Sequence, residues 1–134
     1  MSGQEWVVDA YGCDAAALAD LGKLRGLFAR MIEELSLRPV GETKWHQFPS
    51  TGGITGLCLL AESHLACHTF PEYGSLCLNL FCCKPRPEWE FTAYLEREFA
   101  ARSVRIRRLE RPYQIDEHSR ELPELRRADP LPLV

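Results

Sequence analysis

Residues 61–83 read AESHLACHTFPEYGSLCLNLFCC, and this stretch determines how the neighbouring segments are arranged. Residues 63–69 and 76–83 are apolar and strand-like, and Pro71 and Gly74 between them are typical turn residues. The stretch therefore predicts two antiparallel strands joined by a turn. It also holds two histidines, two glutamates and four cysteines within 23 residues. Few purely structural segments need that density of reactive groups.

One face of the second strand is predicted to be buried. Leucines occupy positions 76, 78 and 80, and the positions between and after them carry Cys77, Asn79, Phe81 and Cys83. Successive side chains of a strand point to opposite faces. We therefore expect the leucines in the core, and the face that carries Asn79 and Cys83 toward a functional site.

The segments on either side predict further strands and two helices. Residues 6–11, 43–48, 54–61 and 103–109 are the additional strand-like runs. Asp14 is placed to cap a helix that reaches about Ser36, with an apolar stripe at alternating steps of four and three. Pro85 and Pro87 precede a second helix, which is expected at 88–101. This order predicts an α+β fold, a two-layer sandwich with a mainly antiparallel sheet and two helices packed on one face.

Length and composition are those of one globular domain. The chain has 134 residues, of which 46% are hydrophobic and 26% charged, with a net charge of -3. We expect a single domain at 1–111 and a C-terminal tail at 112–134. The five arginines between positions 102 and 111 are interpreted as a solvated strand edge, because Glu110 interrupts them and nucleic acid usually needs a broader basic patch.

Location and cysteine chemistry follow from what the sequence lacks. No apolar run is long enough to span a bilayer and no signal peptide precedes the first strand, so a cytoplasmic protein without a membrane partner is expected. Most of the six cysteines lie in strand-like runs, which favours reduced thiols. Cys67, Cys77 and Cys82 are interpreted as filling the core. Cys82 and Cys83 point to opposite faces of a strand and cannot easily hold one ion. We expect no metal site.

The centre of the chain combines groups suited to acyl chemistry. Ser63 stands between Glu62 and a histidine, with His68 five positions later and Thr55 eight positions earlier. A hydroxyl nucleophile, an imidazole and a second hydroxyl can converge if strands 54–61 and 63–69 pair as a hairpin. A serine hydrolase is the weaker interpretation, because no Gly-x-Ser-x-Gly elbow is present and no Asp is placed to orient His68.

The same residues resemble a family with an unusual, long motif. The motif reads Glu62-Ser63-His64, His68-Thr69-Phe70-Pro71-Glu72-Tyr73-Gly74 and Phe81-Cys82-Cys83. It is similar to the hallmark of the small bacterial and archaeal form of S-adenosylmethionine decarboxylase, and the similarity extends more loosely from the first strand to about Arg111. A long and chemically specified motif discriminates far better than a short pattern.

The resemblance implies a chain that cuts itself between Glu62 and Ser63. The Ser63 hydroxyl attacks the carbonyl of Glu62, the amide becomes an ester, and β-elimination leaves fragments 1–62 and 63–134 with a pyruvoyl group made from Ser63. Thr55 matches the residue whose hydroxyl supports the intermediate, and His68 matches the base that removes the α-proton. The pyruvoyl group is then the only cofactor required, and it stays covalently attached.

The resemblance also assigns the residues that act on the substrate. The pyruvoyl ketone binds the substrate amine and withdraws the electrons released with carbon dioxide, a role that pyridoxal phosphate has elsewhere. Cys83 matches the acid that returns a proton. Glu72 matches the residue that holds the ribose hydroxyls, and Phe48 matches the aromatic residue that stacks on adenine. Phe70 stands at the position of a Trp beside the substrate. Relatives of this form are homodimers whose sites use both chains, so a homodimer is expected.

Three departures from the motif leave the substrate open. Phe70 replaces Trp, Asn79 stands where many relatives have Asp, and Lys84 replaces a common Gly. All lie near the expected substrate. The leading hypothesis is decarboxylation of S-adenosylmethionine for spermidine synthesis. The alternatives are a pyruvoyl-dependent L-ornithine or L-arginine decarboxylase on the same scaffold, and a non-catalytic partner subunit, against which the intact Ser63, His68 and Cys83 argue.

Overall fold

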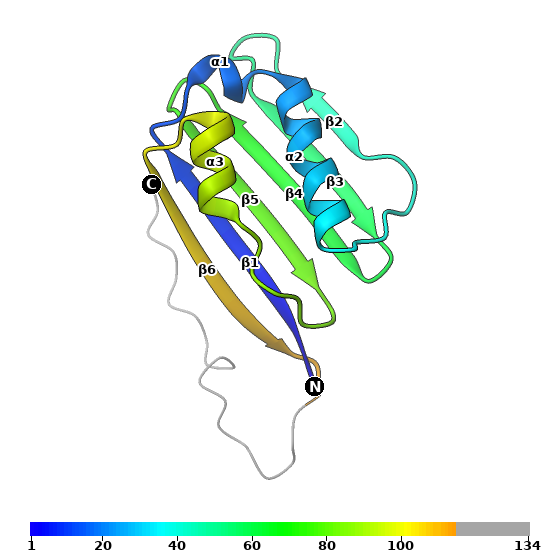
Figure 1. Ribbon diagram of the computed structural model, residues 1–134. Coiled ribbons are helices and arrows are strands. Elements are labelled where there is room, and N and C mark those ends of the chain that lie inside the picture. Colours follow the sequence, from blue (N-terminus) through cyan, green and yellow to red (C-terminus); the bar gives the residue numbers. More distant parts are fainter. Residues whose placement is uncertain (115–134) are drawn as a thin grey trace, which may run out of the picture.

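The computed structural model describes residues 1–114 and contains one six-stranded sheet (Figure 1). All of its strand pairs are antiparallel, in the order β2-β3-β4-β5-β1-β6. The strands are β1 (Ser2–Tyr11), β2 (Lys44–Gln47), β3 (Ile54–Leu60), β4 (Ser63–Phe70), β5 (Ser75–Cys82) and β6 (Ser103–Pro112). The predicted α+β fold with an antiparallel sheet is confirmed.

The described helices lie on one face of the sheet (Figure 1). They are α1 (Ala15–Leu18), α2 (Leu21–Glu34) and α3 (Phe91–Phe99). The single first helix predicted up to Ser36 was wrong, because it is divided into α1 and α2. Asp14 caps α1 by accepting a hydrogen bond from the Ala17 amide at 3.2 Å, and Asp20 starts α2 in the same way with Lys23 at 3.3 Å. A second aspartate suited to an N-cap therefore restarts the helix.

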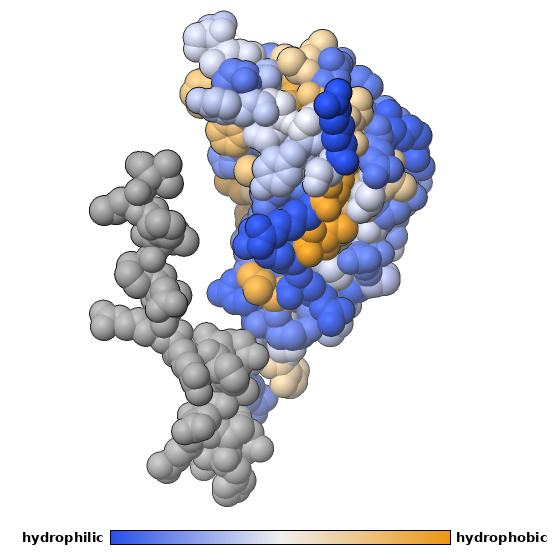
Figure 2. Space-filling view, turned by 90° about the vertical axis from the view of Figure 1, so that its left-hand side faces the viewer, coloured by the Kyte–Doolittle hydropathy of each residue, from blue (hydrophilic) through white to orange (hydrophobic). Residues whose placement is uncertain are grey.

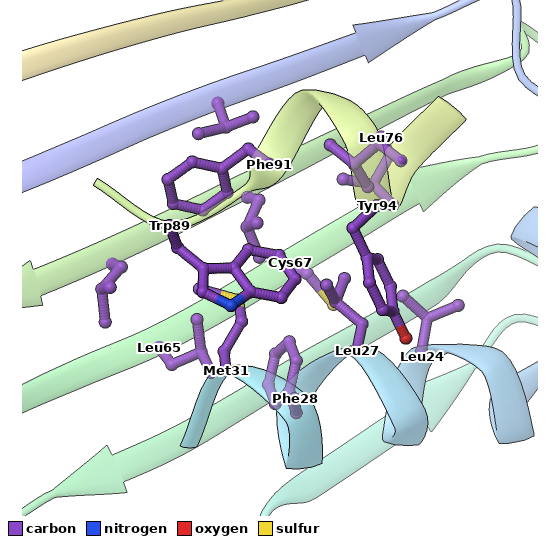
Figure 3. Close-up of a cluster of buried hydrophobic side chains, with 14 of the residues drawn as sticks. Leu24, Leu27, Phe28, Met31, Leu65, Cys67, Leu76, Trp89, Phe91 and Tyr94 are labelled. Atoms are coloured by element: carbon purple, nitrogen blue, oxygen red, sulfur yellow. The ribbon is translucent and has the colours of Figure 1, made fainter. Parts of the chain in front are cut away.

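The hydrophobic core fills the space between the helices and the sheet. Its aromatic and aliphatic side chains come from α2, from α3 and from the loop before α3, and they point onto the middle strands (Figure 3). The predicted leucine face of β5 is in this core, since Leu76, Leu78 and Leu80 are at most 2% exposed. The alternation along β5 is therefore confirmed. It fixes which side chains of the neighbouring strands point away from the helices.

The opposite face of the sheet, called the open face below, carries none of the described helices. It includes large apolar side chains on β3, where Leu57 and Leu59 are 52% and 58% exposed. On β4 the even-numbered residues from His64 to Phe70 share this face, since Leu65, Cys67 and Thr69 between them are buried in the core. A sheet with one covered and one uncovered face leaves half of its side chains available for a site or a partner.

Strand β6 forms one edge of the sheet, as the arginine run predicted. Arg111 pairs with Glu5 and Arg107 lies 3.3 Å from Asp9, so two of these arginines reach across the neighbouring β1. Seen from this side, the surface outside the grey segment is mostly hydrophilic, with small apolar patches (Figure 2). Most of the expected tail, residues 115–134, lies outside the described part of the chain. None of the helices in residues 1–114 has the length and apolar character needed to cross a membrane.

Candidate active site

The β3–β4 hairpin places the predicted scissile bond at the end of a tight turn. Ala61 and Glu62 form the turn, and the strands close it through the pairing of Leu60 with Ser63. A neighbouring segment fixes the turn from outside, because the Ala61 amide donates to the Arg38 carbonyl oxygen at 2.7 Å. Strand β3 ends at Leu60 and β4 begins at Ser63. A cut between residues 62 and 63 would therefore interrupt neither strand.

The Glu62 carboxylate brings basic groups and a thiol together at this turn. Arg38 Nη2 lies 2.7 Å from Glu62 Oε1, and Lys84 Nζ lies 4.0 Å from the same oxygen. The Cys83 thiol donates to Glu62 Oε2 with a sulfur–oxygen distance of 3.7 Å. Ser63, Glu62 and Cys83, which the sequence assigned to one site, are thus neighbours at the end of β5.

The predicted maturation base and its supporting hydroxyl meet elsewhere on the same hairpin. His68 and Thr55 are cross-strand partners, and Thr55 Oγ1 lies 3.2 Å from His68 Nδ1. Both point to the open face. The hydroxyl can therefore fix the orientation of the imidazole ring.

The predicted substrate-binding residues gather at that same end of the sheet. Phe48 follows β2 directly, is 47% exposed, and meets the ring of His46 edge-on at 4.8 Å between centroids. Phe70 ends β4 on the open face, and the turn after it carries Glu72, which is exposed. Two aromatic rings and a carboxylate thus lie beside the pair formed by Thr55 and His68.

Within one chain, Ser63 does not meet His68. The antiparallel register pairs Ser63 with Leu60 and His68 with Thr55, which places them five positions apart on β4. At about 3.3 Å per residue their Cα atoms are roughly 16 Å apart, and the odd spacing puts their side chains on opposite faces. The hairpin predicted from the sequence is formed. The prediction that Ser63 converges with Thr55 and His68 inside one chain is wrong.

A polar network next to Ser63 was not anticipated from the sequence. His64 Nε2 lies 2.9 Å from Asn79 Oδ1, and Asn79 Nδ2 donates to Glu5 Oε2 at 2.8 Å. Because the Asn79 amide donates toward Glu5, its oxygen accepts from His64, which places a proton on Nε2. Phe81 stacks on the His64 ring at 5.7 Å between centroids. The His64 ring, one position after Ser63, is thus held in one orientation.

The other cysteines near the site are kept as neutral thiols. Burial raises the pKa of Cys67 to about 12, which agrees with its predicted place in the core. Cys77 was also predicted as core filling, but it is partly exposed on the open face. Burial, and then the hydrogen bond and charge of Asp9, raise the pKa of Cys77 to about 11. Neither thiol is suited to be a nucleophile at neutral pH.

Comparisons with known proteins point to one family. The model of the S-adenosylmethionine decarboxylase family matches residues 4–112. The S-adenosylmethionine decarboxylase proenzyme of Acetivibrio thermocellus is 36% identical over 107 residues, covering 76% of this chain and 82% of that protein. The corresponding proenzyme of Carboxydothermus hydrogenoformans is 30% identical over 116 residues, covering 86% and 90%. The chain belongs to the S-adenosylmethionine decarboxylase family.

A solved structure supports the fold of this S-adenosylmethionine decarboxylase family member. The adenosylmethionine decarboxylase from Aquifex aeolicus matches with a TM-score of 0.71 at 24% identity, covering 90% of this chain and 98% of that one. In the S-adenosylmethionine decarboxylase family the cofactor is a pyruvoyl group made from a serine of the chain itself. The residues present fit this group, because Ser63 follows a carboxylate-bearing turn that can be cut without loss of a strand.

Two basic residues beside the scissile turn were missed in the sequence. Arg38 binds Glu62, and Arg86 lies with Glu62 and Ser63 around one small cavity. The available signal for Arg86 was a charged residue inside Lys84-Pro85-Arg86-Pro87, directly after Cys83. The prolines were interpreted only as the entry to a helix.

Proposed function

We propose that this chain is a self-processing S-adenosylmethionine decarboxylase whose pyruvoyl group is made from Ser63. The observation that carries the proposal is the β3–β4 turn. There the Glu62–Ser63 bond lies between two intact strands, with the Cys83 thiol 3.7 Å from the Glu62 carboxylate. Membership of the family supplies the chemistry to which this geometry is suited.

Maturation uses residues of the chain alone, with water as the co-reactant. The Ser63 oxygen bonds to the Glu62 carbonyl carbon, the amide C–N bond breaks, and the hydroxyl proton passes to the freed nitrogen, which gives an ester. His68 then removes the Ser63 α-proton, the Cβ–O bond breaks, and Glu62 leaves as a carboxylate. The remaining enamine takes up water and loses ammonia. Thr55, 3.2 Å from His68, orients the base.

During turnover the pyruvoyl group supplies an electron-withdrawing carbonyl that accepts the electrons released with carbon dioxide. The chain's own residues hold the substrate and manage its protons. Cys83 is the proposed proton donor, and its thiol lies on the Glu62 carboxylate. Arg38 and Lys84 lie 2.7 and 4.0 Å from the other oxygen of that carboxylate. The Cys83 thiol on the Glu62 carboxylate thus presents a proton next to position 63, where the carbon dioxide leaves.

We further propose that each site is built by two copies of the chain. Ser63 and Cys83 lie at one end of the sheet, whereas Thr55, His68 and Glu72 lie at the other, roughly 16 Å away along β4. Proton transfer needs contact within hydrogen-bond distance. Two open faces packed about a two-fold axis would bring opposite ends together and cover Leu57 and Leu59. A homodimer with two composite sites would allow the proton transfer and would also cover the exposed leucines.

S-adenosylmethionine is the substrate that the second group of residues favours. Phe48 offers a half-exposed ring for stacking on adenine, and Glu72 offers carboxylate oxygens to ribose hydroxyls. Phe70, on the open face beside them, extends the aromatic surface. L-ornithine and L-arginine have neither a purine nor a ribose, so these groups would be left without a role. We therefore place decarboxylated S-adenosylmethionine, the aminopropyl donor for spermidine synthesis, as the product.

The experiment that tests the function combines mass spectrometry with carbon dioxide release. The purified protein is expected to consist of fragments 1–62 and 63–134, the second blocked to Edman sequencing by its ketone. Labelled carbon dioxide is expected from carboxyl-labelled S-adenosylmethionine and not from ornithine or arginine at equal concentration. A chain that stays whole after long incubation would refute self-processing. Release from ornithine or arginine instead would keep the chemistry and overturn the substrate.

Cys83→Ala is expected to be cut normally but to decarboxylate slowly. The thiol is proposed to act after maturation, so the fragments should appear at the wild-type rate. Loss of a positioned general acid lowers the rate by about 10²- to 10⁴-fold. Cys58→Ala, which removes a thiol buried in β3, is the matched control for the substitution itself. Turnover by Cys83→Ala equal to that of the control would remove Cys83 from the acid role.

A further inference from the structure

A small cavity of about 10 Å³ lies next to the scissile bond, at the opposite end of the β3–β4 hairpin from Thr55 and His68. Glu62, Ser63 and Arg86 are among the residues that line it. The volume is near the smallest that holds one water molecule. Such a space can accept one oxygen atom from a neighbouring group, such as a carbonyl oxygen that moves as its carbon becomes tetrahedral.

Arg86 is held at this cavity by one hydrogen bond from its guanidinium and one from its backbone. Its Nη1 donates to the Leu35 carbonyl oxygen at the end of α2, at 2.7 Å. Its backbone amide donates to Gln4 Oε1 on β1, at 3.0 Å. These contacts fix the side chain between the helix layer and the ends of β4 and β5. The positive charge therefore has little freedom to move away from Ser63.

One N–H donor of this guanidinium has no hydrogen-bond partner within the described part of the chain. Among residues 1–114, Arg86 Nε is the buried side-chain nitrogen or oxygen that lacks a hydrogen-bond partner. Leaving a buried N–H unpaired is unfavourable, and such groups in native structures usually have a functional reason or a missing partner. Since Arg86 lines the cavity beside Glu62 and Ser63, an oxygen formed there is a suitable acceptor.

The thiol of Cys82 supports the placement of Arg86 near Ser63. Cys82 is the cross-strand partner of Ser63, and its side chain is buried on the same face. Burial raises the pKa of the Cys82 thiol, and the Ser63 hydroxyl and the Arg86 guanidinium beside it oppose the rise. Both groups therefore lie next to one sulfur atom.

We propose that Arg86 stabilises the negative charge on the former Glu62 carbonyl oxygen while Ser63 attacks it, and so accelerates the first step of self-cleavage. This inference rests on the proposed function. As the Ser63 Oγ–C bond forms, the π electrons of the carbonyl move onto its oxygen, and the buried Nε–H donates to that oxygen. When the C–N bond breaks the carbonyl is restored, and the charge disappears. A donor already in place needs no reorganisation at that moment.

The test follows cleavage of newly made chains in a cell-free translation system with a pulse of labelled methionine. Arg86→Met is expected to be cut about 10²- to 10³-fold more slowly than the wild type, as when one oxyanion donor is removed. Millimolar guanidinium is expected to restore part of the rate in Arg86→Ala. Arg30→Gln, which removes an exposed arginine paired with Glu34 on α2, is expected to cut at the wild-type rate.

Hydroxylamine identifies the step at which Arg86 acts. It cleaves esters readily and amides slowly, so it should release fragments from His68→Ala, which lacks the base for the second step. Arg86→Met should accumulate the amide and remain resistant. A purely structural role predicts no rescue by guanidinium and no difference in hydroxylamine sensitivity.

Three outcomes separate this inference from the proposed function. Wild-type chains that are never cut would refute the function itself. Cutting of the wild type and Arg86→Met at equal rates would overturn only the role of Arg86, as would a slow Arg86→Met that is sensitive to hydroxylamine. If circular dichroism shows that Arg86→Met is unfolded, Arg86→Lys is tested instead, because it keeps a cation near the Leu35 carbonyl. This variant is expected to be cut slowly and to resist hydroxylamine. Cutting of Arg86→Lys at the wild-type rate would equally overturn the inference.

Discussion

Ser63→Ala is expected to remain one uncut chain and to release no carbon dioxide from S-adenosylmethionine. Without the hydroxyl oxygen no ester can form at Glu62, so β-elimination has no bond to break. Without cleavage there is no ketone to bind the substrate amine, and the decarboxylation loses its electron acceptor. Activity should therefore fall below detection. The backbone pairing of residue 63 with Leu60 and Cys82 does not depend on the side chain, so the fold should be kept.

The measurement is intact mass together with release of labelled carbon dioxide. Ser103→Ala is a matched control, because Ser103 also begins a strand and is exposed on β6, far along the chain from the turn. It is expected to be cut and active. Fragments of Ser63→Ala that still meet at position 62 would show that another residue performs the attack.

The fold could be predicted from the sequence wherever side chains alternate regularly. The leucines of β5 and the stripe of the first helical segment each indicate a buried face, and both faces are in the core. The division of the first helix was missed because its apolar stripe continues across the break. A new helix starts there because the Asp20 side chain caps the Lys23 amide, and the apolar periodicity does not show this cap.

The candidate site shows a similar limit. Pairing of strands 54–61 and 63–69 was predicted, and it places Thr55 against His68. The separation of Ser63 follows from the two-residue turn, which fixes the register, and from the odd spacing along β4. Arg86 could not be found in the same way. Its meaning depends on the end of α2 and on a cavity that exists only once the helices pack on the sheet.

Co-expression of Ser63→Ala and His68→Ala chains is expected to restore cleavage that neither variant shows alone. In a mixed dimer, one site combines the intact Ser63 of the His68→Ala chain with the intact His68 of its partner. The other site lacks both groups. With equal amounts and random pairing, about half of the His68→Ala chains should be cut, and the Ser63→Ala chains should stay whole. A mass tag on one variant distinguishes the two by mass spectrometry.

The asymmetry of this result separates a shared site from one built within a single chain. If Ser63 and His68 of the same chain acted together, the His68→Ala chain could not be cut in any mixture. The matched control pairs His68→Ala with the double variant Ser63→Ala/His68→Ala, where no intact histidine is present and no fragment should form. A mixture that stays whole while the wild type is cut would contradict the two-chain site. Fragments from the tagged His68→Ala chain alone would instead show that the roughly 16 Å between the two ends of β4 is bridged by a second copy.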